Sequence, residues 1–289
     1  MDLEQISISR LKEGSEISEF YYQKPLLILY SGGKDSEIIL NLAKKAGILY
    51  EVQHSHTTAD APETVRHIRN RFHELELQGV KCTINYPYYK RKRTSMWDLI
   101  PCKGMPPTRL VRYCCSILKE TAGKDRVCVS GVRRAESVKR TSRGLLETIN
   151  SNIDDRIILN SDNDDRRMII ERCQMQSKIM CNVIVDWDNN LVKDYIQSCH
   201  LNLNPLYNEF NRVGCIGCPM AGKRGRQIEF AKYPAYKNMY IKSFDRMLAV
   251  RKLNGKDCKN WQTGLDVYHW WMEDGVLPGQ LSLFDDFNF

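Results

Sequence analysis

A run of six residues in the first quarter of the chain, Ser31-Gly32-Gly33-Lys34-Asp35-Ser36, has the composition of a phosphate-binding loop. Two glycines allow the backbone to fold closely around an anion, and two serine hydroxyls add hydrogen-bond donors. An apolar strand pattern precedes the run and a helical pattern follows it, so the first free NH groups of the helix would point at the same anion. The run is shorter than a Walker loop and does not end in Lys-Ser or Lys-Thr. It predicts a phosphate site of another type.

Two compact cysteine pairs, Cys114-Cys115 and Cys215-x-x-Cys218, form a second chemical pattern. A CxxC pair alone suits a redox dithiol or half of a zinc site, but adjacent cysteines cannot easily direct both sulfurs at one tetrahedral zinc. A 4Fe-4S cluster accepts such a pair more readily, because each sulfur binds a different iron. The spacing therefore favours a 4Fe-4S cluster over zinc or unligated thiols.

Basic residues follow the predicted strand 127–130, beginning just after Gly131. They are Arg133, Arg134, Lys139 and Arg140. If this strand lies in the same sheet as the phosphate loop, its carboxyl end brings the cations to the same edge, which predicts a second anion contact.

Residues 86–93, Tyr-Pro-Tyr-Tyr-Lys-Arg-Lys-Arg, interleave aromatic rings with cations. Such a segment can contact a phosphate backbone and stack bases, although a solvated basic loop fits the pattern equally well. His54 and His56 are lone histidines that are interpreted as ordinary hydrogen-bonding residues.

The elements that would position these residues alternate between strand and helix. Strands are predicted at 26–30, 48–54, 81–86, 127–130 and 182–187, and helices at 37–46, 62–78, 109–120 and 190–198. This order is typical of an α/β fold with a doubly wound, mainly parallel sheet, whose ligands bind at the carboxyl ends of the strands. We expect a long loop through residue 107 and a protruding hairpin or mobile loop over 150–167.

Helical aromatic patterns from residue 234 and over 265–272 predict a smaller helical carboxyl-terminal region. We therefore expect a nucleotide-binding α/β domain over residues 1–205, followed over 206–289 by the CxxC segment, the helical region and a docking tail.

The 289-residue chain is long enough to bury a substantial core, and its 42% hydrophobic and 27% charged residues are ordinary for a globular protein. The net charge of +8 favours an acidic partner such as a nucleotide or nucleic acid. No apolar run approaches the roughly 20 residues of a membrane span, and residues 1–10 lack a signal-peptide core. The composition predicts a cytoplasmic protein with no membrane partner.

The phosphate loop resembles the PP-loop of the ATP pyrophosphatases, and further motifs resemble the phosphoadenosine phosphosulfate reductase family within that superfamily. The similarity runs from about residue 24 to about residue 220. Its other motifs are Pro62-Glu63-Thr64, Tyr113-Cys114-Cys115 with Leu118-Lys119, Gly131-x-Arg133-x-x-Glu136-Ser137-x-x-Arg140, Asp186-Trp187, and Asn204-Pro205-Leu206-Tyr207 before Gly214-Cys215-x-x-Cys218-Pro219.

This resemblance implies roles for single residues. Lys34 would contact phosphate, Asp35 would bind magnesium, and Arg133 would join them in catalysis. The nucleotide would also contact other residues of the loop and of the Gly131 motif. These are Ser31, Gly32, Gly33, Ser36, Gly131, Glu136 and Arg140. The cysteine quartet resembles that of cluster-bearing members, which include adenylylsulfate reductases and the sulfurtransferases of bacterial DNA phosphorothioation.

Three features depart from the sulfonucleotide reductases. The tail from Leu277 to Phe289 has no cysteine, the phosphate loop is intact, and Ala59-Asp60-Ala61 replaces Asp-Thr-Gly. We therefore expect ATP-dependent sulfur transfer to a nucleic acid, DNA by preference, with ATP, Mg²⁺ and a 4Fe-4S cluster as cofactors and a cysteine desulfurase as sulfur donor. The alternatives are a sulfonucleotide reductase that releases sulfite and a DNA-binding regulator with a redox-sensing cluster.

The tail adds a separate hypothesis. Gln280-Leu281-Ser282-Leu283-Phe284 resembles the short peptide by which bacterial DNA enzymes dock on the sliding clamp, where a leucine and a phenylalanine fill an apolar pocket. A hydrophobic tail that folds back on its own domain fits the same residues.

Overall fold

The computed structural model describes residues 2–136, 140–141, 143–149, 158–159, 178–256, 258 and 261–273. The chain divides into two compact units. Unit 1 comprises Met1–Ser55, Pro62–Asn85 and Ala122–Val213, and unit 2 comprises His56–Ala61, Tyr86–Thr121 and Gly214–Phe289. The last segment of unit 2 begins near the expected boundary at residue 205, but unit 2 also includes two segments from the earlier part of the chain.

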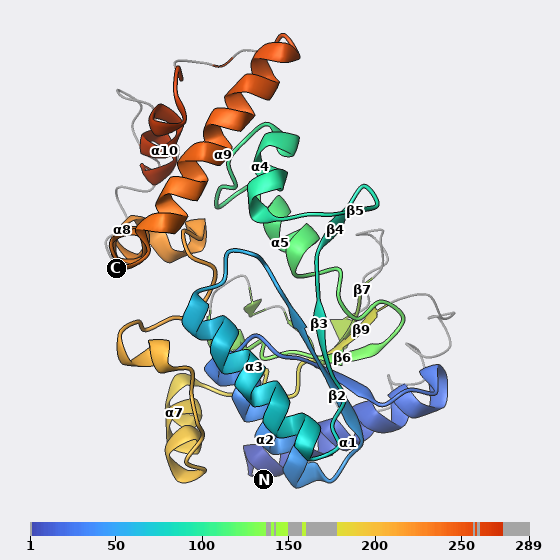
Figure 1. Ribbon diagram of the computed structural model, residues 1–289. Helices are drawn as coiled ribbons and strands as arrows, with labels where there is room; N and C mark the ends of the chain where they lie inside the picture. The colour runs from blue at the N-terminus through green and yellow to red at the C-terminus, as the bar shows by residue number, and fades with distance from the viewer. Residues whose placement is uncertain are drawn as a thin grey trace. The chain divides into compact units, whose positions relative to one another are not determined.

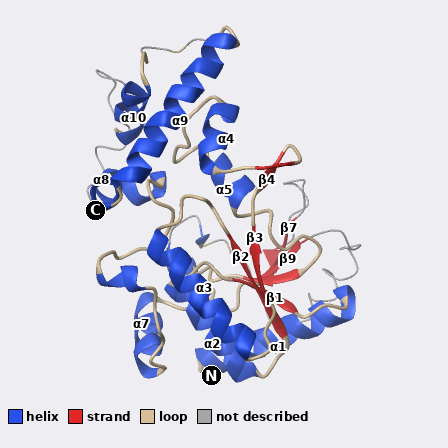
Figure 2. Cartoon of the chain, viewed as in Figure 1, coloured by secondary structure: helices blue, strands red, loops and turns tan. Residues whose placement is uncertain are grey.

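Unit 1 contains the predicted mainly parallel sheet (Figures 1 and 2). The strands are β1 (Leu26–Leu29), β2 (Tyr50–Ser55), β3 (Cys82–Asn85), β6 (Val127–Val129), β7 (Leu146–Ile149), β8 (Ile158–Leu159) and β9 (Lys178–Cys181). Their order is β3-β2-β1-β6-β9-β7-β8. The first five in this order are parallel, and β7 and β8 form an antiparallel edge. The chain order therefore reverses next to β1, and an open α/β sheet binds ligands at such a point.

Helices flank this sheet because their apolar faces pack against its apolar residues. They are α1 (Leu3–Tyr22), α2 (Lys34–Ala46), α3 (Pro62–Leu77) and α7 (Asn189–Ser198). Ile38, Ile39 and Leu42 of α2 are fully buried in the same core as Leu26 and Ile28 of β1. Helix α2 ends as its sequence predicts, because Gly47 takes the left-handed conformation at φ +66°.

The predicted strand over 182–187 is wrong. The strand is β9, which ends at Cys181, and residues 183–186 form turns. Val183, Ile184 and Trp187 are nevertheless fully buried, and the Trp187 indole donates a hydrogen bond to Ser7 Oγ at 3.0 Å. A short, wholly apolar run shows burial but does not distinguish a strand from a buried turn.

Unit 2 is mostly helical, as expected for its last segment. Its elements are the hairpin strands β4 (Tyr88–Tyr89) and β5 (Lys92–Arg93), with α4 (Met96–Lys103), α5 (Tyr113–Leu118), α8 (Gly222–Lys232), α9 (Pro234–Leu253) and α10 (Gly264–Met272). The aromatic stripes form packing contacts, as in the ring pairs of Tyr240 with Phe230 and with Trp271. Within the described residues, no helix has the length and apolar character needed to cross a membrane.

The expected long loop before residue 107 is wrong in detail, because it contains both the hairpin and α4. Ser95 gave a usable signal: its side chain accepts a hydrogen bond from Asp98 N and caps α4. Helix α5 is shorter than the predicted 109–120. Most of the expected loop at 150–167 and all of the tail at 280–284 lie outside the described residues.

Candidate functional site

The phosphate loop joins β1 to α2 in unit 1, as the sequence predicts. Gly32 has a positive φ of +72°, and a Cβ there would lie 2.9 Å from Ile68 Cγ1, so both conformation and space require glycine. Gly33 has extended backbone and stands at the N-cap of α2. The helix therefore begins at Lys34 with its first amides directed toward the loop, where the helix dipole favours an anion.

The two serine hydroxyls hold the loop in shape. Ser36 Oγ donates to the Gly33 carbonyl at 2.8 Å and accepts from the Ser31 amide at 3.3 Å. The Ser31 and Ser36 hydroxyl oxygens lie 3.2 Å apart. The loop is therefore folded in the protein alone, and a phosphate would find its donors already arranged.

Tyr207 reaches the loop from the 3-10 helix Pro205–Asn208. The Lys34 amide donates a hydrogen bond to its hydroxyl at 3.0 Å, and burial raises the pKa of this phenol. Asn204, which caps the same helix, donates to the Gly32 carbonyl at 3.4 Å and to Thr64 Oγ1 at 3.0 Å. The sequence contained this signal as the Asn-Pro-Leu-Tyr motif but did not indicate which residue it would contact.

Asp35 is held by Arg133. The Arg133 Nε donates to Asp35 Oδ1 at 2.7 Å, and its NH1 donates to the Trp187 carbonyl and to Asn189 Oδ1 at 3.3 and 3.1 Å. Arg133 is only 1% exposed. Sequence reasoning predicted an anion contact for Arg133, and the anion that its guanidinium contacts in the structure is the Asp35 carboxylate.

The other residues of the Gly131 motif surround this pair. Glu136 Oε2 accepts from the Arg133 amide at 3.2 Å and forms an ion pair with Arg140. Arg134 pairs with Asp186 at 2.5 Å, and Lys139 lies outside the described residues. The predicted group of cations is thus largely neutralised by carboxylates where the structure describes it.

Gly131 packs directly against the turn that carries Asp35. A Cβ at Gly131 would lie 2.7 Å from Asp35 Cβ and 3.2 Å from the Asp35 carbonyl carbon. The second contact is with backbone, which cannot rotate out of the way.

We predict that Gly131→Ala displaces Asp35 and lowers the rate of the ATP cleavage expected from the sequence by about tenfold or more, because misplaced catalytic groups lose much of their effect. Gly14→Ala is the control, since a Cβ there meets Leu26 at an ordinary 3.5 Å. Initial rates of AMP release measure both variants. Equal rates for Gly131→Ala and wild type would show that the close packing at Asp35 has no functional role.

All four cysteines of the predicted quartet belong to unit 2. Cys114 and Cys115 lie on α5, and Cys215 and Cys218 flank a tight turn. Gly217 makes this turn possible: its φ is +71°, and a Cβ would lie 2.6 Å from the Phe230 ring. Cys215 is buried and the other three are half-buried.

The segment around Cys215 is fixed to residues 57–60. The Ile216 amide donates to the Ala59 carbonyl at 2.8 Å, and Asp60 and Cys215 form an antiparallel bridge. The Cys215 thiol donates to Thr57 Oγ1 at 3.3 Å. Sequence reasoning missed Thr57, which follows His56 and whose type alone does not suggest this contact.

The four sulfurs influence one another's ionisation. The pKa of Cys115 is lowered by a hydrogen bond from Cys114, and also by Arg112, whose NH2 donates to its sulfur at 3.2 Å. The pKa of Cys114 is raised by that hydrogen bond and by burial, and then by the charges of the other three cysteines. The pKa of Lys119 is raised, chiefly by the charge of Cys215. The structure thus gathers both predicted pairs and adds two nearby cations.

Among the described residues, the group of metal-ligating side chains whose ligand atoms lie within 4.8 Å of one another contains no cysteine. A metal site at the four cysteines therefore stays a prediction.

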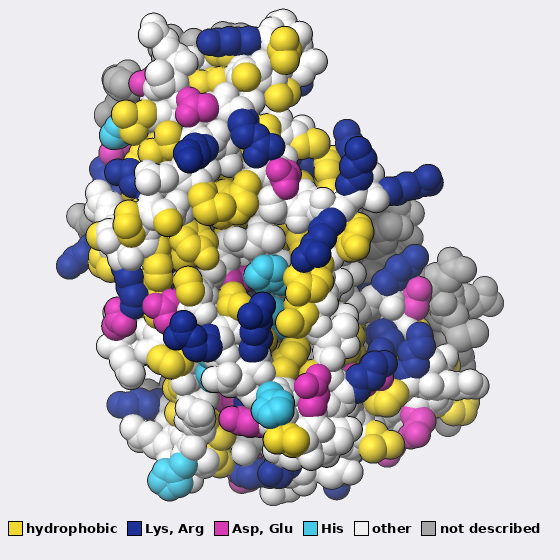
Figure 3. Space-filling view, viewed as in Figure 1, with side chains coloured by type: hydrophobic (Ala, Val, Ile, Leu, Met, Phe, Trp, Pro, Cys, Tyr) yellow, Lys and Arg dark blue, Asp and Glu magenta, His cyan; other side chains and the backbone are white. Residues whose placement is uncertain are grey.

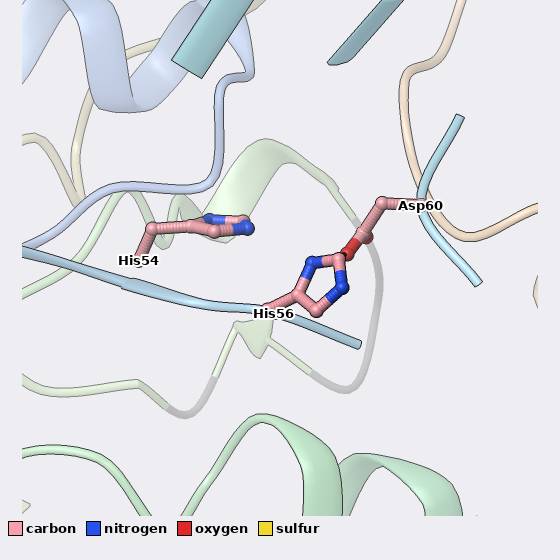
Figure 4. A group of neighbouring side chains, drawn as sticks. All are labelled: His54, His56 and Asp60. Atoms are coloured by element: carbon pink, nitrogen blue, oxygen red, sulfur yellow. Dashed lines mark ion pairs between the residues drawn. The ribbon is translucent and has the colours of Figure 1, made fainter. Parts of the chain in front are cut away.

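Each of the two histidines forms a polar contact within its own unit. His54 Nδ1 lies 3.0 Å from the Tyr30 carbonyl inside unit 1. In unit 2 the His56 ring is turned toward Asp60, with Nδ1 3.5 Å from Oδ2 (Figure 4). Asp60 Oδ2 also accepts from the Thr57 amide at 2.8 Å. Asp60 therefore stabilises the turn that carries Thr57.

The charges divide unequally between the units. Unit 1 contains 24 basic and 24 acidic residues, and unit 2 contains 19 and 11, which together make the 43 and 35 of the chain. The whole net charge of +8 therefore belongs to the unit with the cysteine quartet. Figure 3 shows Lys and Arg side chains over α4, α9 and the β4–β5 hairpin.

Three comparisons relate the chain to known proteins. No curated protein sequence matches it. Among solved structures, it is similar to phosphoadenylyl-sulfate reductase from Candida auris, at 16% identity over 72% of this chain and 93% of that chain, with a TM-score of 0.44. It is also similar to an ATP complex of FMN adenylyltransferase from Candida glabrata, at 10% identity over 74% and 60% of the two chains and a TM-score of 0.47. NH3-dependent NAD synthetase from Campylobacter jejuni is 12% identical over 91% and 100%, with a TM-score of 0.41.

The model of the phosphoadenosine phosphosulfate reductase domain matches residues 25–221. This range includes the phosphate loop, Arg133 and all four cysteines of the quartet, and it agrees with the extent expected from the motifs. The chain therefore belongs to the phosphoadenosine phosphosulfate reductase domain family.

Proposed function

We propose that this enzyme splits ATP into AMP and pyrophosphate to activate a nucleic acid, DNA by preference, for sulfur transfer. The observation that carries the proposal is the complete phosphate loop, in which Gly32, Gly33 and the two serines form an anion cradle in front of α2. Beside it, Asp35 presents a carboxylate. A loop that only bound a preformed sulfonucleotide would not need this combination of phosphate cradle and metal-binding carboxylate.

ATP and Mg²⁺ fit the residues present. The loop amides and the Lys34 ammonium would hold the β- and γ-phosphates. Asp35 Oδ1 is occupied by Arg133, but Oδ2 has no protein partner within the part of the chain that the structure describes. This second oxygen would bind Mg²⁺, a cation that prefers carboxylate and phosphate oxygens. Arg133 acts as a positioning residue that fixes the carboxylate.

The reaction would proceed by two displacements. An oxygen of the acceptor attacks the α-phosphorus of ATP, the bond to the β-phosphate bridging oxygen breaks, and pyrophosphate leaves. Lys34 and the loop amides stabilise its charge. A sulfur nucleophile at the sulfide level then displaces AMP from the activated acceptor, so that sulfur replaces the oxygen that leaves with AMP. The second step requires no further ATP.

The quartet would hold a 4Fe-4S cluster through Cys114, Cys115, Cys215 and Cys218. When bound, such a cluster supplies redox chemistry and an affinity for sulfur. A cysteine desulfurase would deliver the sulfur. Arg112 and Lys119 would offset the negative charge that four thiolates bring to this unit.

The charge distribution supports a nucleic-acid acceptor. Unit 2 contains the full +8 of the chain beside the cysteines, whereas unit 1 is neutral. A polyanion would therefore be attracted to the unit with the sulfur-handling residues.

The proposal is tested anaerobically on cluster-reconstituted protein. One reaction contains ATP and DNA, and the other contains adenylylsulfate and reduced thioredoxin; AMP, pyrophosphate and sulfite are quantified in both. We expect pyrophosphate from ATP without sulfite from adenylylsulfate. Sulfite release without pyrophosphate would instead identify a sulfonucleotide reductase, and tight DNA binding without either product would favour the regulator.

For the tail, we propose that Gln280-Leu281-Ser282-Leu283-Phe284 docks on a bacterial sliding clamp. The proposal depends on the sequence alone, because these residues lie outside the described part of the chain. A peptide of residues 277–289 should bind an isolated clamp in a titration, and its Leu283→Ala, Phe284→Ala form should not. Absence of binding by the unchanged peptide would exclude this role.

A further inference from the structure

The β4–β5 hairpin has an unusual turn. Tyr89 pairs with Lys92, so the loop contains only Lys90 and Arg91. Both have positive φ values, of 49° and 63°, as a type I′ turn requires. Asn-Gly is the favoured sequence for this turn, and long side chains with a Cβ are unfavourable there. The chain thus places two cations where the backbone favours other residues, and backbone strain of this kind is concentrated at functional positions.

The cations of the hairpin are available to a ligand. Residues Lys90 to Arg93 are all exposed, and within the described residues none of them forms an ion pair with a carboxylate. Their charge is therefore not neutralised by the protein, in contrast to Arg133 and Arg140 in unit 1.

Aromatic rings stand among these cations. Tyr88 pairs with Arg93 across the hairpin, and its side chain is 62% exposed. The Arg93 guanidinium lies over the Tyr86 ring at 4.0 Å. An exposed ring beside cations can stack an unpaired base while the cations contact neighbouring phosphates.

The hairpin is connected to the cysteine quartet inside unit 2. Lys103 of α4 donates a hydrogen bond to the Tyr89 hydroxyl at 3.1 Å and lies 5.9 Å from the ring centroid of Tyr113. Tyr113 immediately precedes Cys114. A strand bound on the hairpin would therefore lie on the same small unit as the sulfur-handling residues.

We propose that the β4–β5 hairpin binds single-stranded nucleic acid, with a base stacked on Tyr88 and phosphates contacted by Lys90 and Arg91. This inference rests on the proposed function, for which it names the binding element and the strandedness of the acceptor. A paired base offers no free face to an exposed ring, whereas an unpaired base does.

The turn itself provides the test. Lys90→Asn, Arg91→Gly replaces both cations with the favoured type I′ pair, so the hairpin keeps its shape and the melting temperature should stay equal or rise. Binding of a fluorescent oligothymidine about 20 nucleotides long is measured by anisotropy over a range of salt concentrations, with the full chain and without ATP. We expect about tenfold weaker binding, and a salt slope smaller by about 1.4 for two lost phosphate contacts.

A matched control removes the same charge from unit 1. Lys12→Gln, Lys44→Gln replaces two exposed lysines there and should leave affinity and salt slope unchanged. For stacking, Tyr88→Ala should weaken binding about 5- to 150-fold while Tyr88→Phe stays within about twofold of wild type. Tyr88→Ala should not weaken the binding of duplex DNA.

The outcomes separate this proposal from the proposed function. If both hairpin variants bind oligothymidine like wild type, the hairpin is not the binding element, even where wild type still forms AMP with DNA. Heparin is a polyanion without bases and serves as a second ligand. If Lys90→Asn, Arg91→Gly weakens the binding of heparin and of oligothymidine equally, and Tyr88→Ala changes neither, the hairpin is a nonspecific basic patch. Normal hairpin-dependent binding without any AMP formation would instead contradict only the proposed function.

Discussion

Asp35→Asn is expected to reduce the formation of AMP and pyrophosphate from ATP by at least about 10³-fold, several kcal/mol of lost transition-state stabilisation. The amide oxygen of the substituted side chain can still accept the hydrogen bond that Arg133 Nε now donates at 2.7 Å, so the loop should keep its shape. What disappears is the negative charge on Oδ2, the oxygen proposed to bind Mg²⁺. Steady-state assays of pyrophosphate release measure the loss.

Two measurements distinguish this loss from unfolding. Asp35→Asn leaves the buried Arg133 without its anion, which we expect to cost about 1 to 3 kcal/mol of unfolding free energy. Glu51→Gln is a matched control, because Glu51 is a carboxylate of unit 1 paired with Arg126 at 2.8 Å and lies outside the loop. It should lose comparable stability and retain AMP formation. Substantial activity in Asp35→Asn would disprove the magnesium role.

The sheet of unit 1 was largely predictable because its signals are local. Three features could each be recognised from adjacent residues alone. They are the buried strand before Ser31-Gly32-Gly33, the end of helix α2 at Gly47 and the Pro at the start of α3. The prediction of a strand at 182–187 was wrong because it also used local signals alone. Its apolar residues are buried by packing against residues such as Ser7, and no local pattern reveals that contact.

The organisation of unit 2 was not predictable in this way. The unit brings 56–61 and 86–121 together with the last segment, and bonds such as Ile216 to Ala59 join residues far apart in the sequence. The motifs predicted the cysteine quartet, but they did not predict the contact of Cys215 with Thr57. The same limit applied to Arg133, whose residue type suggested an anion contact while its partner, Asp35, lies 98 positions away.

Cys215→Ser is expected to lower the iron and acid-labile sulfide content of reconstituted protein from about four of each per chain to near zero. The reason is that Cys215 is buried, so solvent cannot replace its sulfur as a ligand without disrupting the proposed site. Cys102→Ser is the control, because Cys102 is an exposed thiol of the same unit outside the quartet. Activation by ATP belongs to unit 1 in our proposal, so Cys215→Ser should still release pyrophosphate while forming no thiolated product. Zinc bound at one per chain in place of iron, or iron unchanged by the substitution, would overturn the cluster assignment. Loss of pyrophosphate release together with iron would mean that activation and sulfur transfer are not separate functions of the two units.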